Sequence, residues 1–132
     1  MVGGKVTAPG QSRGTDIQGG HSQRLTKGDV MVITFELDGR EFMGLNGGPL
    51  FKFTEAVSLV VHCEDQAEID YYWGKLTADG GQESQCGWLK DKFGLSWQIV
   101  PSIIGQLMSG DPVRANRVMQ AVMPMKNWTF RK

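Results

Sequence analysis

The chain has 132 residues, a length that suits one domain. Hydrophobic residues make up 40% and charged residues 21%, with a formal net charge of zero. This composition excludes a disordered or fibrous chain and gives no bulk attraction to nucleic acid or to a membrane surface. Apolar runs are strand-sized, far below the roughly 20 residues of a membrane-spanning helix, and no secretory signal pattern opens the chain. We expect a soluble, cytoplasmic protein that binds neither nucleic acid nor membrane.

The first part of the chain divides into a leader and a β-hairpin. Residues 1–27 are rich in Gly, Ser, Gln and Thr without helical or strand periodicity, and we interpret them as a mobile leader. Residues 31–37 and 41–46 are rich in β-branched and aromatic side chains and flank Asp38-Gly39, a pair that tolerates positive φ. They predict a β-hairpin.

A strand and a helix are expected next. Residues 56–63 predict a strand from their run of Val and Leu. Asp65, with Glu68 three residues later, has the pattern of a capping box, and apolar residues then follow at helical spacing. This pattern predicts a helix over residues 66–77.

The remainder predicts two strands and two helices. Residues 83–89 and 95–100 look like strands that are joined by a turn at residues 91–94. Pro101 is expected to open a short amphipathic helix. Asp111 caps a second helix, which Pro112 opens and which carries an apolar stripe up to Val122.

A weak internal repeat relates the hairpin to the later strands. Aligning Gly39 with Gly94 superposes residues 32–45 on residues 87–100. A repeated hairpin with one helix between the copies is the trace that paired βαβββ modules leave in a sequence.

Two long segments carry a family resemblance: FELDGREFMGLNGGPLFKFTEAVSL and CGWLKDKFGLSWQIVP. They resemble the PhnB-like, or demethylubiquinone methyltransferase-like, branch of the vicinal oxygen chelate superfamily, which includes glyoxalases and bleomycin-resistance proteins. The resemblance covers roughly residues 28–123 and implies an α+β fold of paired βαβββ modules.

The resemblance also implies how the domain is divided. Relatives carry a strand and a helix upstream of residue 28, and the leader of this chain does not have that pattern. We therefore expect one domain over residues 28–132, with a truncated first module (28–50), a complete second module (55–100) and C-terminal helices (101–123). Because a partial module leaves a sheet edge and apolar surface uncovered, we predict a homodimer, which the resemblance also implies.

Superfamily enzymes chelate a divalent metal with His, Gln or Glu on inward-facing strand positions. The resemblance puts Ser58 at the histidine position and Gln98 at the glutamate position, and the repeat puts Met43 opposite Gln98. Ser is a weak ligand, Met is soft, and Gln98 brings no charge that offsets dehydration of a hard cation. We expect neither a metal nor another cofactor, because the chain also lacks a Gly-rich strand-to-helix turn that could seat S-adenosylmethionine.

Period-two parity selects the residues of the pocket face. It places Ser58, Val60 and His62 on one side of their strand, and Cys63 on the side that packs against the helix. The candidate ligand-binding residues are Glu41, Met43, Ser58, His62, Ser96 and Gln98. His62 could serve as a base, but a lone histidine at a strand end is more often simply exposed. Glu41 and Ser96 could likewise be ordinary polar positions on the outward side of their strands.

The two cysteines and the second histidine add little chemistry. Cys63 and Cys86 form no CxxC pair, so we expect reduced thiols. A nucleophilic Cys86 would need an adjacent base that the sequence does not show. His21 lies in the leader, where we expect no fixed partner.

These residues do not identify a reaction, and three functions stay open. The favoured hypothesis is a binding module without catalytic metal that holds a small apolar or aromatic molecule. The alternative is a metal-dependent lyase, isomerase or dioxygenase whose site is completed across a homodimer by Gln98, His62 and Glu64. Third, the chain could be a remnant domain that only folds as a dimer.

Overall fold

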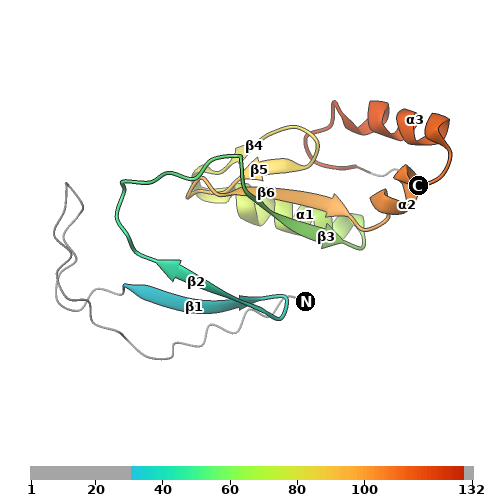
Figure 1. Ribbon diagram of the computed structural model, residues 1–132. Helices are drawn as coiled ribbons and strands as arrows, with labels where there is room; N and C mark the ends of the chain where they lie inside the picture. The colour runs from blue at the N-terminus through green and yellow to red at the C-terminus, as the bar shows by residue number, and fades with distance from the viewer. Residues whose placement is uncertain (1–30, 130–132) are drawn as a thin grey trace. The chain divides into compact units, whose positions relative to one another are not determined.

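A computed structural model describes residues 31–129 of the chain (Figure 1). The chain divides into two compact units, one ending at Lys52 and the other beginning at Phe53. The leader expected over residues 1–27 lies outside the described residues. No helix within residues 31–129 is long and apolar enough to cross a membrane.

The first unit contains the predicted β-hairpin. Strands β1 (Val32–Leu37) and β2 (Arg40–Leu45) form an antiparallel two-stranded sheet. Asp38 and Gly39 make the turn with φ of 48° and 75°, the left-handed region that an Asp-Gly turn tolerates. Phe35 stacks on Phe42 across the strands, with ring centroids 5.7 Å apart. The hairpin prediction is confirmed.

The second unit is a complete βαβββ module. Its sheet has the strand order β3-β6-β5-β4, in which β3 and β6 are parallel and the other pairs antiparallel. The predicted α+β fold is therefore confirmed. In chain order the module comprises β3 (Ser58–Cys63), α1 (Gln66–Thr77), the short 3₁₀ helix η1 (Ala78–Gly80), β4 (Gln82–Glu83), β5 (Trp88–Lys90) and β6 (Ser96–Pro101).

Helix α1 begins where the sequence predicts. The Asp65 side chain accepts a hydrogen bond from the Glu68 N–H at 2.8 Å, which satisfies one of the free donors of the first turn. The Glu68 carboxylate accepts from the Glu64 N–H, also at 2.8 Å. In a capping box this second bond comes from the N–H of the cap residue, Asp65, but here it comes from the preceding residue, Glu64. The predicted helix bounds of 66–77 are confirmed.

One face of the module's sheet is covered and forms the core. Cys63 and Ile99 on this face are fully buried and belong to the same cluster as Ile69 and Trp73 of α1. The predicted direction of Cys63 is confirmed. The buried core residues are Cys63, Ile69, Trp73, Leu89, Ile99, Val122 and Trp128.

The single strand predicted over residues 83–89 is wrong, because β4 and β5 are separate antiparallel strands. Cys86 and Gly87 have φ of 56° and 78°, which breaks the extended backbone between them. Their N–H groups donate to the carbonyls of Met125 and Lys126 at 2.7 and 2.8 Å. The turn is therefore held by the C-terminal segment, a tertiary contact without a local signal.

The helix start expected at Pro101 is also wrong. Pro101 is buried at the end of β6, and the Ser102 N–H donates to the Cys63 carbonyl at 2.8 Å, next to the parallel β3–β6 pair. Helix α2 (Ile104–Met108) begins three residues later. The predicted second helix is confirmed as α3 (Pro112–Val122), with the Asp111 carboxylate accepting from the Val113 N–H at 3.0 Å.

Beyond α3, the chain returns to α1. Trp128 is only 6% exposed, and its carbonyl accepts a hydrogen bond from Gln66 Nε2 at 2.9 Å. Asn127 Nδ2 donates to the Asp70 carboxylate at 3.1 Å. Residues 124–129 carry no local signal for a helix or strand, yet they complete the core.

Candidate ligand-binding site

The sheet face opposite α1 carries the polar side chains of the module. Side chains alternate along β6, so Ser96 and Gln98 point away from the face where Ile99 is buried. Strand register lines up neighbours across this open face. Two rows of side chains run across the strands. The first row consists of Ser58, Ser96, Lys90 and Gln82, and the second of Val60, Gln98 and Trp88.

Two of the predicted site residues touch each other. Gln98 Nε2 donates a hydrogen bond to Ser58 Oγ at 2.8 Å, between residues 40 apart in the sequence. These are the positions that the family resemblance equates with metal ligands. The structure therefore brings together the pair that the resemblance selected.

The donor set does not fit a divalent metal. Ser58 and Gln98 are neutral, and their polar groups are directed at each other. Lys90 lies in the same row as Ser58 and adds a positive charge to the face. Within residues 31–129, no three His, Cys, Asp or Glu side chains gather as a metal site. A hard cation needs several oxygen ligands with negative charge, which this face does not offer.

A cavity of about 430 Å³ reaches this face, where Gln82, Trp88, Lys90 and Ser96 line it. Its size is typical of a small-molecule site. Trp88 and Leu89 are the apolar residues of the lining, and the other lining residues are polar. The cavity is lined by Glu55, Gln82, Glu83, Ser84, Trp88, Leu89, Lys90 and Ser96.

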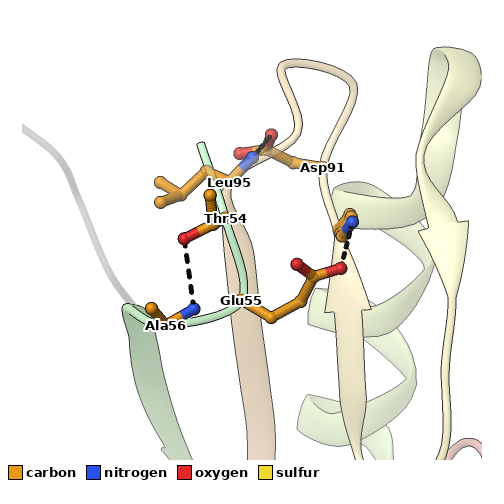
Figure 2. A network of polar contacts seen from close by, with 6 residues as sticks. Thr54, Glu55, Ala56, Asp91 and Leu95 are labelled. Carbon is orange, nitrogen blue, oxygen red and sulfur yellow. Dashed lines mark hydrogen bonds and ion pairs between the residues drawn. The ribbon is translucent and has the colours of Figure 1, made fainter. Parts of the chain in front are cut away.

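An ion pair forms part of the lining of this cavity. Glu55, in the segment before β3, contacts Lys90 Nζ of β5, and Figure 2 shows its side chain directed toward that strand. The hydrogen bond from Lys90 lowers the pKa of Glu55, helped by a backbone hydrogen bond and by the positive charge. Thr54 Oγ1 accepts from the Ala56 N–H at 3.3 Å within the same segment. The segment thus places a carboxylate on the one lysine of the cavity lining.

Ser96 lies between Ser58 and Lys90 and is only 1% exposed. Its hydroxyl has no hydrogen-bond partner among the described residues. An unpaired buried hydroxyl costs roughly 1–3 kcal/mol, and native proteins contain few of them. Ser96 is therefore a polar group of the cavity whose hydrogen bond is missing.

The remaining predicted residues lie elsewhere. His62 is exposed near the end of β3 and does not line the cavity. Glu41 and Met43 lie on β2, in the first unit, where the pleat puts both on one face and Met43 is 70% exposed. The binding role of these three residues stays a prediction.

Of the residues that line the cavity, sequence reasoning selected Ser96 and missed the others, among them the ion pair of Lys90 and Glu55. Lys90 shares the parity of Trp88, so the period-two rule that selected Ser96 would also have selected Lys90. Glu55 carries no such signal, because it precedes β3 and reaches the site only through the fold.

Comparison with known proteins identifies the family. A sequence model of the 3-demethylubiquinone-9 3-methyltransferase family matches residues 11–100. The chain belongs to this family. The PhnB protein from Bacillus cereus shares 31% sequence identity and superposes with a TM-score of 0.58, over 76% of this chain and 81% of that chain. No curated protein matches the chain.

These matches place the chain in the PhnB-like branch of the glyoxalase, or vicinal oxygen chelate, superfamily, as its sequence indicated. The family match begins at residue 11, so it includes part of the leader that the resemblance left out.

Proposed function

We propose that this PhnB-like protein is a small-molecule binding module that works without a catalytic metal. The observation that carries the proposal is the direct hydrogen bond between Gln98 and Ser58, at the positions where superfamily enzymes are expected to hold metal. The cavity on the same face supports binding of a ligand with an apolar or aromatic body, since Trp88 contributes to its lining.

Methyl transfer, which the family's name suggests, is not part of this proposal. Nucleotide-type cofactors commonly sit at a Gly-rich turn between a strand and a helix. Between β3 and α1 that turn consists of Glu64 and Asp65, and the Asp65 and Glu68 side chains already accept the nearby N–H groups. These acidic residues do not fit such a cofactor.

A homodimer is the second part of the proposal. An isolated two-stranded hairpin is marginally stable in water, and this hairpin exposes Ile33 on one face and Met43 and Leu45 on the other. A second copy would cover such surfaces. Sedimentation of the full chain should give twice the monomer mass, and Met43→Lys should lower that mass. A natural chain that sediments as a monomer contradicts this part.

We also expect a cytoplasmic location, which suits the free thiols of Cys63 and Cys86.

Binding can be tested by nuclear magnetic resonance. Small aromatic compounds are titrated into chelator-treated protein, and the titration is repeated with a divalent metal added. The proposal expects shifts at the Ser58, Trp88 and Gln98 amides that are the same in both series. Tyr71→Ala, an exposed position on α1, serves as the control that leaves binding unchanged. Binding that requires the metal would favour the metal-dependent enzyme instead.

A further inference from the structure

The Glu55–Lys90 ion pair and the buried Ser96 hydroxyl are one feature of the cavity. Lys90 and Ser96 are register partners on neighbouring strands, so their side chains leave the same face side by side. The Lys90 ammonium is paired with the carboxylate of Glu55, which belongs to the chain itself. The Ser96 hydroxyl has no hydrogen-bond partner among the described residues. Together they offer two donors to one acceptor group.

We propose that this cavity binds a small carboxylic acid with an aromatic or apolar body, whose carboxylate replaces Glu55 on Lys90 and accepts a hydrogen bond from Ser96. This inference rests on the proposed binding function and names the class of ligand. Glu55 occupies the position on Lys90 that the ligand's carboxylate would take.

The charges of the lining favour an anion once Glu55 has moved. Two acidic residues line the cavity, Glu55 and Glu83. Glu83 is engaged elsewhere, because its carboxylate accepts from Trp73 Nε1 at 2.8 Å and lies 3.6 Å from Lys126 Nζ. When Glu55 is displaced, Lys90 is left without its carboxylate partner. The Lys90 ammonium then needs a new counter-ion.

The exposure of the Glu55 carboxylate makes the exchange feasible. Glu55 has a side chain that is 64% exposed, whereas that of Lys90 is 34% exposed. An exposed ion pair contributes little, so a ligand that adds further contacts can replace it. Ser96 is only 1% exposed and lines the cavity, so a ligand held there by Lys90 can offer its hydroxyl an acceptor. Trp88, in the adjacent row, provides a surface on which a ring can pack.

The test compares benzoate with benzyl alcohol, which has the same ring without the charge. Affinities come from titrations followed by the Trp88 and Lys90 amide shifts of the metal-free full chain. We expect benzoate to bind about tenfold more tightly, since a charge-assisted hydrogen bond is the stronger kind. Lys90→Met should remove this preference, and Ser96→Ala should weaken benzoate binding. Lys92→Met, an exposed lysine of the next turn, is the matched control and should change nothing.

Glu55→Gln keeps the inference testable even if Lys90→Met fails to fold. It removes the competing carboxylate, so benzoate should bind several-fold more tightly, with benzyl alcohol unaffected. Weaker benzoate binding in Glu55→Gln, or equal binding of both compounds to the natural chain, overturns the inference. Equal binding would leave the metal-free binding module standing. If neither compound binds without metal but both bind with it, the proposed function fails as well.

Discussion

The two faces of the module's sheet follow different rules. On the face covered by α1, strand residues such as Leu89 and Ile99 are fully buried, and the Trp73 indole N–H donates to Glu83. On the open face, Ser96 is just as buried but has no hydrogen-bond partner among the described residues. The covered face is arranged for stability, whereas the open face keeps a destabilising polar group, as binding sites commonly do. We therefore expect substitutions that disturb the covered face to destabilise the chain, and removal of the Ser96 hydroxyl on the open face to stabilise it.

The largest expected effect is at Gly87, behind the covered face. Its φ is +78°, and an added Cβ would lie 2.6 Å from the Ile99 carbonyl and would also collide with the Trp128 ring. Gly87→Ala should lower the free energy of unfolding by about 3 kcal/mol or more. Urea denaturation followed by tryptophan fluorescence measures this. Gly94→Ala is the control, with φ of +85° and open space around it, and should cost about 1 kcal/mol. Equal losses would show that Trp128 does not pack as described.

Asp91 comes next, because it fastens the β5–β6 turn to the covered face. Its carboxylate accepts from the Phe93 and Leu95 N–H groups at 2.9 and 3.0 Å and from Trp97 Nε1 at 2.9 Å. Asp91→Ala should cost about 2–3 kcal/mol in thermal or urea unfolding, since these donors lose a charged acceptor. Asp91→Asn, which keeps one acceptor oxygen, should cost less. A loss no larger than that of an exposed variant such as Lys92→Ala would contradict this account.

Ser96→Ala tests the open face and has the opposite sign. Because it removes a buried hydroxyl without a partner, we expect a gain of about 1 kcal/mol in the free energy of unfolding. Ser58→Ala is the comparison, because it removes the acceptor of Gln98 Nε2 and should not stabilise the chain. Destabilisation by Ser96→Ala would mean that the hydroxyl has a partner.

The smallest effect concerns Cys63 on the covered face. Burial, together with the nearby carboxylates of Glu68, Asp65 and Glu64, raises the pKa of its thiol from 9.0 to about 11. The unfolded chain ionises first, so this contribution to stability is present below pH 9 and is lost as the pH rises toward 11. At pH 8, iodoacetamide should modify Cys86 and leave Cys63 intact until urea unfolds the chain. Equal labelling of both thiols in the folded protein would contradict the burial of Cys63.

Local signals account for what the sequence predicted of the fold. The Asp38-Gly39 turn and the Asp65 cap act within a few residues, and the β-hairpin and α1 follow from them. The break between β4 and β5 escaped prediction because its N–H groups are satisfied by Met125 and Lys126, from the far end of the chain. The burial of Trp128 was not predicted either, because it depends on contacts with α1, which is distant in the sequence.

The candidate site was predictable in part. Strand parity and family resemblance selected Ser58, Ser96 and Gln98, which the register brings onto one face. The Glu55–Lys90 ion pair was not predictable, since one partner lies outside any strand and the contact depends on how its segment folds back. Residue type and spacing thus locate a face, whereas the fold decides which charges meet on it.

Metal content per chain decides between a metal-free binding module and a metal-dependent enzyme. Protein purified without chelators is analysed for its elements, together with its mass in solution. We expect a dimer with only trace metal, whose ligand binding survives chelation. A stoichiometric divalent metal that disappears in Gln98→Ala would rule out the metal-free module, because Gln98 and Ser58 would then be ligands rather than partners of each other.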